Sequence, residues 1–366
     1  MNPIRLLLFP FALLYGAAVW LRNQLYNIGV FHEHTFDVPT IVVGNLTVGG
    51  TGKTPHTEYL IKLLSKEYNI ATLSRGFGRI TNGFLLANTN STHEDIGDEP
   101  RLFKHKFPDL TVSVDGNRVR GIQSLLAHDS GLDIILLDDA FQHRRVKPEV
   151  SILLTEYSKT YKEDFLMPVG NLREQSSNSQ RADIIIITKC PPVLSPLDRR
   201  ALRDKIAPKS YQNVYFSYLD YGILQPVNPN LNALHYRTVT KALLFTGIAN
   251  SEPLLYFLKS QKIEITHLKY GDHHNFTETD IEQLIEEFER INRKNNAIII
   301  TTEKDYMRMI GEEKFEPVLS KPLYTQPIEV KFHGEDNEEF NEQILNYVRR
   351  NKVHSDLSKK ENKPGA

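Results

Sequence analysis

The sequence predicts an α/β protein with a phosphate-loop (P-loop) NTPase-type, mostly parallel sheet flanked by helices, and with a smaller C-terminal α/β lobe. A β-branched run at 38–43 leads into a glycine-rich turn and an amphipathic segment, which is the strand, loop and helix order of a P-loop. An isoleucine-rich run at 182–188 is typical of a strand buried on both faces of a parallel sheet. The length of 366 residues exceeds one typical domain, so we expect two lobes.

Apolar runs between turn signals predict the remaining strands. They are short, and most are followed by a polar turn or by a helical pattern, as in successive strand and helix units. Together with the two runs above they supply the strands of both lobes. The further expected strands lie at 69–74, 111–114, 132–137, 150–155, 242–246 and 297–302.

Composition limits the classes of partner. Lys and Arg total 44 against 45 Asp and Glu, a formal net charge of -1, so no global positive field indicates nucleic-acid binding. The single cysteine, Cys190, excludes an internal disulfide framework and fits a reducing compartment. The sequence has no Cys-x-x-Cys pair and no His-Glu-x-x-His motif, so no structural or protease-type zinc site is expected. We infer neither a nucleic acid nor an obligate protein partner.

Four segments are expected along the chain: a membrane-anchoring helix at 1–30, the P-loop domain at 31–220, the smaller lobe at 221–350 and a disordered tail at 351–366. Between Arg5 and Arg22 lie sixteen uncharged residues. As a helix they cover about 24 Å, less than the ~30 Å hydrocarbon core of a bilayer. A spanning helix, a helix in the membrane interface and a helix packed on the protein's own core stay open, and a retained anchor is favoured over a removed signal peptide.

The glycine-rich turn indicates a phosphate site. Its backbone N–H groups can surround a polyphosphate, Lys53 can reach the β and γ oxygens, and the Thr54 hydroxyl can bind Mg²⁺. Thr47 stands where the pattern G-x-x-x-x-G-K-[ST] has its first glycine. The preceding strand and the following helix, which Pro55 opens, favour a P-loop over an ordinary glycine turn. The residues expected to hold phosphates are Thr47, Val48, Gly49, Gly50, Thr51, Gly52, Lys53 and Thr54.

Acidic residues follow the apolar strand at 132–137. Asp138 and Asp139 stand at its carboxyl end, where P-loop proteins place the carboxylate that holds Mg²⁺ directly or through water. The alternative is a simple Asp-Asp turn, which loses weight because a phosphate loop needs such a partner. The polar segment at 141–145 adds Gln142 and other candidate metal and phosphate ligands.

Three further motifs have both a structural and a functional interpretation. In a Gly-Asp-Glu-Pro sequence, Asp98 can cap a helix, or it can act with Glu99 as base and metal ligand near the phosphates. Arg173 can neutralise a transferring phosphate, or it can belong to a solvated helix start. His273 is one of two adjacent histidines, and spacing alone favours a solvated loop before a helix capped by Thr277.

These motifs together resemble one family closely, tetraacyldisaccharide 4'-kinase, the lipid A 4'-kinase of Gram-negative bacteria. They occur in the family's order, and Thr47 in place of the first glycine is itself typical of the family. Two positions depart from it, Ala140 where glycine is usual and Asn171 where proline is common, and neither change removes a reactive group. The matching motifs lie at 44–45, 47–55, 74–79, 97–100, 138–144, 170, 172–174, 245–248, 272–274 and 302–305.

The resemblance implies ATP-dependent phosphorylation of the 4'-hydroxyl of a tetraacylated glucosamine disaccharide 1-phosphate, giving lipid IVA, at the cytoplasmic face of the inner membrane. ATP and Mg²⁺ are the implied cofactors, and the acylated disaccharide lipid and the inner-membrane bilayer are the implied partners. Asp98 would be the catalytic base paired with His273, across two lobes that close over the nucleotide. From the chemistry of phosphoryl transfer, an arginine such as Arg75 or Arg173 can neutralise the charge that develops on the phosphate. The implied Mg²⁺ shell is Thr54, Glu99, Asp138, Asp139 and Gln142.

The main rival is a membrane-tethered P-loop nucleotide switch or accessory ATPase without a small-molecule substrate. Guanine-specific switches carry Asn/Thr-Lys-x-Asp after a strand. Here Lys189 is followed by Cys-Pro with no aspartate, and Lys304 precedes Asp305 without the spacer, so ATP is favoured over GTP. A soluble kinase of a polar metabolite is a third possibility, which the apolar N-terminal segment disfavours.

Overall fold

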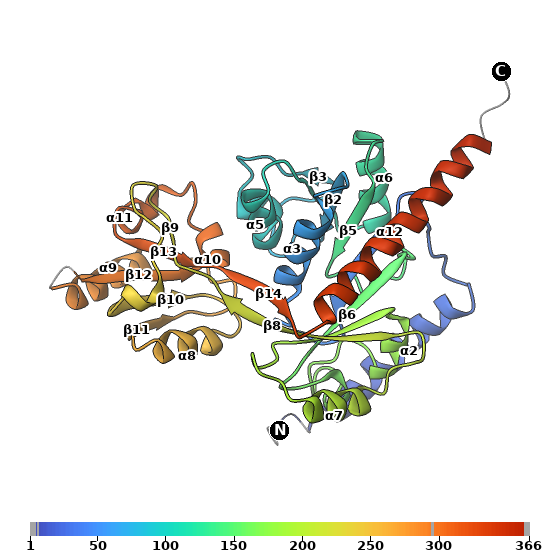
Figure 1. Ribbon diagram of the computed structural model, residues 1–366, viewed down its shortest axis with the longest axis horizontal. Coiled ribbons are helices and arrows are strands. Elements are labelled where there is room, and N and C mark those ends of the chain that lie inside the picture. The colour runs from blue at the N-terminus through green and yellow to red at the C-terminus, as the bar shows by residue number, and fades with distance from the viewer. Residues whose placement is uncertain (1–4, 6, 294–295, 362–366) are drawn as a thin grey trace.

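Two sheets organise the chain. The structure, a computed structural model, describes residues 5, 7–293 and 296–361 (Figure 1). Neighbouring strands of the larger sheet are parallel except at its two edges, where β14 pairs with β8 and β3 with β4 in antiparallel fashion. In spatial order the strands are β14 (Ile328–Phe332), β8 (Asn213–Tyr221), β7 (Ile184–Thr188), β6 (Val150–Glu156), β1 (Thr40–Asn45), β5 (Ile134–Asp138), β2 (Ile70–Ser74), β4 (Thr111–Val114) and β3 (Leu85–Leu86).

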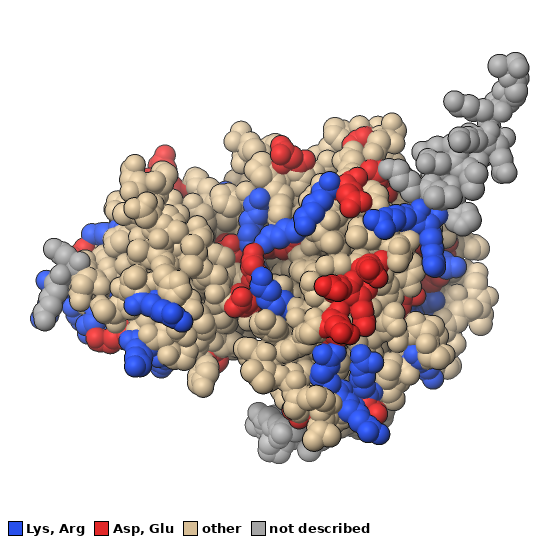
Figure 2. Space-filling model, viewed as in Figure 1, with Lys and Arg blue, Asp and Glu red and all other residues tan. Residues whose placement is uncertain are grey.

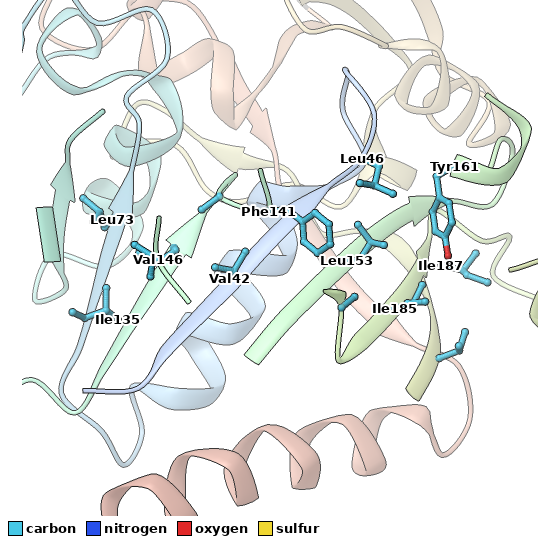
Figure 3. Close-up of a cluster of buried hydrophobic side chains, with 14 of the residues drawn as sticks. Val42, Leu46, Leu73, Ile135, Phe141, Val146, Leu153, Tyr161, Ile185 and Ile187 are labelled. Carbon is cyan, nitrogen blue, oxygen red and sulfur yellow. The ribbon is translucent and has the colours of Figure 1, made fainter. Parts of the chain in front are cut away.

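Helices cover both faces of the larger sheet because its strands are apolar on both sides. Along β1, Val42 packs on one face with Leu73 and Ile135 (Figure 3), whereas Ile41 and Val43 pack on the other, as the two-residue period of a strand requires. One face carries α3 and α12, and the other carries α6 and α7. The helices of this lobe are α3 (Lys53–Leu64), α4 (His93–Ile96), α5 (Asp98–Lys106), α6 (Arg118–His128), α7 (Pro196–Ile206) and α12 (Asp336–Glu361).

The smaller lobe is a second α/β layer beside the first (Figure 1). Its strands β10, β11, β12 and β13 are parallel, and the short β9 is antiparallel to β13. The strands in spatial order are β11 (Glu264–Lys269), β10 (Lys241–Thr246), β12 (Ala297–Thr302), β13 (Leu323–Gln326) and β9 (Gln225–Pro226). The helices are α8 (Glu252–Ser260), α9 (Glu278–Ile291), α10 (Glu303–Met307) and α11 (Glu316–Leu319).

The sheets divide the chain differently from the expected ranges 31–220 and 221–350. After β13 the chain returns to the larger sheet, where β14 pairs with β8 and α12 packs beside it (Figure 1). This return buries Val330, Phe332 and Phe340 in the core under α3. Burial of these apolar side chains stabilises the arrangement, so 328–350 belongs to the P-loop lobe at the level of the sheets.

The expected disordered tail at 351–366 is in part helical. α12 continues to Glu361 without a break, and 362–366 lie outside the described residues. The segment is polar, but it contains three lysines, Leu357 and Glu361, which tolerate a helix well, and it extends a helix that is already formed. The structure thus describes 351–361 as a continuation of α12, and a disordered tail at 351–366 stays a prediction.

The N-terminal helix α2 (Phe9–Asn27) lies against the P-loop lobe along one face only. Ala12 and Gly16 are buried there, whereas Leu14 and Trp20 are 70% and 50% exposed on other faces. None of the helices in the described residues is long and apolar enough to cross a membrane. The first residues of the expected segment 1–30, namely 1–4 and 6, lie outside the described part of the chain.

Charged side chains of both signs share the surface. Figure 2 shows basic and acidic clusters interspersed on one face of both lobes, in keeping with the near-zero formal charge of -1. With no single field over that face, an anionic ligand there must be held by a local site.

Candidate active site

The P-loop joins β1 to α3 at the carboxyl edge of the larger sheet. Gly52 adopts the left-handed conformation, with φ 89°, which lets the turn deliver Lys53 as the first residue of the helix. The Lys53 ammonium lies 3.4 Å from Asn45 Oδ1 and 3.6 Å from Asp139 Oδ1. The buried Thr51 hydroxyl has no hydrogen-bond partner. The loop thus offers backbone donors and an ammonium group beside a carboxylate, as a polyphosphate site requires.

A second segment closes over this loop from the chain around Arg173. The backbone N–H of Val48 donates to the carbonyl of Asn171 at 2.8 Å, and that of Arg173 donates to the carbonyl of Leu46 at 2.7 Å. The Arg173 guanidinium donates to Asp139 Oδ1 at 3.1 Å. The structure therefore places Arg173 at the phosphate loop, and not in a solvated helix start.

Asp138 and Asp139 meet the loop because β5 lies directly beside β1. Burial raises the pKa of Asp138 to about 7, and repulsion from Asp139 and Glu99 adds to this shift. Burial would also raise the pKa of Asp139, but the cations Lys53 and Arg173 hold it below its usual value. Asp139 is therefore paired with two cations, whereas Asp138 forms an ion pair with neither of them in the part of the chain that the structure describes.

These residues fit a magnesium ion bound partly by phosphates. Among the described residues no three His, Cys, Asp or Glu side chains converge as a complete metal site. Mg²⁺ in such enzymes uses one or two carboxylates together with phosphate oxygens and water, and a bound cation would relieve the repulsion that Asp139 and Glu99 exert on Asp138. Glu99 accepts a hydrogen bond from Lys304 at 2.6 Å, and Gln142 Nε2 donates to the carbonyl of Asn45 at 2.7 Å.

The structure brings Asp98 and His273 together from different lobes. Asp98 is the first residue of α5, whose N-cap is Gly97, so its carboxylate is not the cap of that helix. Asp98 Oδ2 lies 2.8 Å from His273 Nδ1. His274 next to it bonds Asp280 instead, at 2.9 Å, within the cap of α9. The solvated-loop interpretation thus describes neither histidine.

A buried arginine that the sequence did not single out completes this contact. Burial alone would raise the pKa of Asp98, but hydrogen bonds from His273 and Arg308 outweigh burial and hold the pKa well below its usual range. Arg308 Nε donates to Asp98 Oδ2 at 2.9 Å. It follows Asp305 by three residues, and this helical spacing of opposite charges was the available signal.

Other supporting residues also lacked a sequence signal. Thr57 donates to Asp138 Oδ1 at 3.1 Å, and buried Arg118 donates to the carbonyl of Asp138 at 3.3 Å. Burial lowers the pKa of Arg118 to about 10, so the group stays charged. The site as a whole combines a phosphate cradle, a carboxylate pair and a carboxylate–imidazole pair, a set suited to phosphoryl transfer.

Comparison with known proteins identifies the family. A family model described as tetraacyldisaccharide-1-P 4'-kinase (LpxK) matches residues 4–349. The chain belongs to this family. The tetraacyldisaccharide 4'-kinase of Bacteroides thetaiotaomicron is 43% identical over 97% of this chain and 96% of its own, and that of Flavobacterium psychrophilum is 45% identical over 95% and 98%. The predicted family is therefore confirmed.

A solved structure supports the fold directly. The crystal structure of LpxK from Aquifex aeolicus in complex with ATP has a TM-score of 0.73 and 25% sequence identity, and the match covers 94% of this chain and 99% of that chain. The predicted α/β fold is confirmed, and membership of the tetraacyldisaccharide 4'-kinase family makes the chain a kinase of lipid A biosynthesis. The nucleotide-switch alternative gains no support.

Proposed function

We propose that this protein transfers the γ-phosphate of ATP to the 4'-hydroxyl of a tetraacylated glucosamine disaccharide 1-phosphate, forming lipid IVA. The observation that carries the proposal is the contact between Asp98 and His273 at 2.8 Å, which adds a proton acceptor to a phosphate loop. A nucleotide switch has no need of such an acceptor, whereas transfer to a sugar hydroxyl does. Membership of the kinase family supports the same assignment.

In this proposal Asp98 takes the proton of the 4'-hydroxyl. The hydroxyl oxygen then forms a bond to the γ-phosphorus, and the bond from that phosphorus to the β-γ bridging oxygen breaks, with its electron pair leaving on ADP. Lys53 and Arg173 neutralise the negative charge that spreads over the phosphate oxygens. The loop at 47–54 seats the phosphate groups through its backbone N–H donors, other than those of Val48 and Thr51, which donate to the carbonyls of Asn171 and Gly49.

Magnesium belongs to the same proposal. Thr54, Glu99, Asp138, Asp139 and Gln142 would hold the ion. When bound, Mg²⁺ neutralises phosphate charge and orients the γ-phosphate. Lys53 and Arg173 already flank Asp139, so the ion would add charge mainly beside Asp138.

We further propose that α2 brings the enzyme to the cytoplasmic face of the inner membrane, where its lipid substrate resides. The support is the exposed apolar surface of α2, which includes Leu14 and Trp20. A large apolar patch at one side of a protein favours burial in a bilayer interface.

Purified protein, ATP, Mg²⁺ and the tetraacyl disaccharide 1-phosphate in detergent micelles provide the test. We expect lipid-dependent transfer of radiolabelled phosphate to the disaccharide, and loss of transfer in Lys53→Ala. Transfer no greater than that of Lys53→Ala would exclude the kinase assignment. ATP hydrolysis without labelled lipid would favour the accessory ATPase.

A further inference from the structure

Arg308 is held in a rigid cradle before it reaches Asp98. Its side chain is 3% exposed, and its Nη1 donates to Asp305 Oδ1 at 3.0 Å and to the Gly247 carbonyl at 3.1 Å. Asp305 is itself fully buried and accepts a hydrogen bond from the Gly247 backbone N–H at 3.0 Å. The guanidinium is therefore fixed by groups of its own lobe, because a side chain bound on several sides has no other rotamer available.

Gly247, the residue after β10, packs closely against Arg308 and Asp305. A Cβ added at Gly247 would lie 3.1 Å from Arg308 Nη1 and 3.1 Å from Asp305 Oδ1. The same Gly247 carbonyl also accepts a hydrogen bond from the backbone N–H of His273 at 3.1 Å. One carbonyl thus sets the relative positions of the two groups that contact Asp98.

Both of these groups bind the same oxygen of Asp98. Arg308 Nε lies 2.9 Å from Oδ2, and His273 Nδ1 lies 2.8 Å from Oδ2. Within the part of the chain that the structure describes, Oδ1 accepts no hydrogen bond, and it is not sealed from solvent. Two donors on one oxygen fix the plane of a carboxylate and leave the other oxygen as the free acceptor.

We propose that Arg308 is a positioning residue: with His273 it holds Oδ2 of Asp98 so that Oδ1 is the atom that accepts the substrate proton. This inference rests on the proposed role of Asp98 as base. The proton moves from the 4'-hydroxyl to Oδ1, the oxygen bonds the γ-phosphorus, and the electron pair of the broken bond leaves with ADP. Arg308 exchanges no proton or electron in this step.

The orientation of the Asp98 carboxylate also depends on contact between the two lobes. Asp98 belongs to the P-loop lobe, whereas Arg308 and His273 belong to the smaller lobe. Arg101, on the same helix as Asp98, makes a different contact between the lobes, through its guanidinium to the carbonyls of Met307 and Ile310. Arg101 therefore offers a matched control, an arginine that joins the lobes without bonding the Asp98 side chain.

The test compares Arg308→Ala, Arg308→Lys and Arg101→Ala with the wild type in the micelle assay. We expect Arg308→Ala to lower kcat about 100-fold, the usual cost of misplacing a catalytic group by about 1 Å, with both KM values changed less than about threefold. Added guanidinium should restore part of the kcat of Arg308→Ala and none in Arg101→Ala. Arg308→Lys should fall between, because one ammonium cannot keep the fork of contacts.

The outcomes separate this inference from the proposed function. A wild type that transfers no phosphate defeats both. If the wild type is active, the inference is overturned by an unchanged kcat in Arg308→Ala, by an equal loss in Arg101→Ala, or by a loss confined to KM. If Arg308→Ala does not fold, Arg308→Lys decides, and a wild-type kcat in that variant overturns the inference.

Discussion

Substitution of Asp98 should affect the rate of phosphate transfer much more than the affinity for ATP. Asp98→Asn keeps the size of the side chain but cannot accept a proton, so we expect kcat to fall about 10²- to 10⁴-fold while ATP affinity stays nearly unchanged. His273→Ala should lower kcat in the same direction, because it removes one of the donors on Oδ2. Turnover and the dissociation constant of a fluorescent ATP analogue measure the two quantities.

The neighbouring histidine provides the control for this prediction. Within the described part of the chain, His274 bonds Asp280 at the start of α9 and forms no hydrogen bond or ion pair with Asp98, so His274→Ala should keep wild-type turnover. If Asp98→Asn retains wild-type kcat, Asp98 is not the base. If both histidine variants lose turnover equally, the effect of His273 is one of folding.

For the candidate site, the sequence predicted which residues take part better than it predicted which of them touch. Resemblance paired Asp98 with His273, and the structure has them in contact. It did not find Arg308, because that contact joins residues 210 positions apart and depends on how the two lobes meet. Spacing shows which residues share a helix face, whereas a pair between lobes is set by tertiary packing alone.

Helix α2 has one side bonded to the P-loop lobe and an opposite, exposed side that is apolar. Its inner side is tied to the active-site loops, since the Tyr15 hydroxyl donates to the Arg173 carbonyl at 2.7 Å and Arg22 donates to the Gln142 carbonyl at 2.6 Å. Its other faces expose large apolar side chains. The helix thus carries apolar surface next to the loops that hold the phosphate site.

Charges on the exposed side of α2 should weaken membrane binding. We expect Leu14→Glu with Leu21→Glu to reduce sedimentation with phospholipid vesicles several-fold, because each charge would have to enter the apolar layer. Tyr256→Glu, at a residue 78% exposed on the smaller lobe, is the control and should sediment like the wild type. Equal sedimentation of all three proteins would contradict a role of α2 in membrane binding.

Element prediction succeeded where a strand is buried on both faces. β7 lies within its expected run, and β1 and β5 overlap theirs and end one or two residues later, since a continuous apolar stretch leaves few alternatives. The expected range 221–350 put the residues of β14 in the smaller lobe, whereas β14 is an edge strand that pairs with β8, more than a hundred positions earlier in the chain. Local patterns show that such a strand exists but not which sheet it joins.

At the scale of the whole molecule, an ion cluster joins the lobes beside the site. The Lys106 ammonium of α5 lies 2.8 Å from the carboxylates of Glu58 on α3 and of Glu303 on α10. Burial raises the pKa of Glu58 to about 7, although Lys106 opposes this shift. Glu58 and Glu303 share one cation here. Ionising the buried Glu58 carboxyl therefore costs free energy, and this cost lowers the stability of the folded protein in which the two lobes meet.

This cluster predicts how stability depends on pH. The pKa of Glu58 is about 7 in the folded protein against 4.5 as its ordinary value. Between these values the folded state keeps a proton that the unfolded state releases, so this stabilising contribution is full below about pH 4.5 and is lost as pH rises through about 7. The side chain that Glu58→Gln introduces does not titrate, so the variant does not lose this contribution as pH rises. Between about pH 4.5 and about pH 8, the unfolding free energy of the variant should therefore rise relative to that of the wild type by up to about 3 kcal/mol. Urea unfolding of both proteins at about pH 4.5 and about pH 8 measures the difference. If the unfolding free energies of both proteins change equally with pH, Glu58 is already ionised in the folded protein and the prediction is wrong.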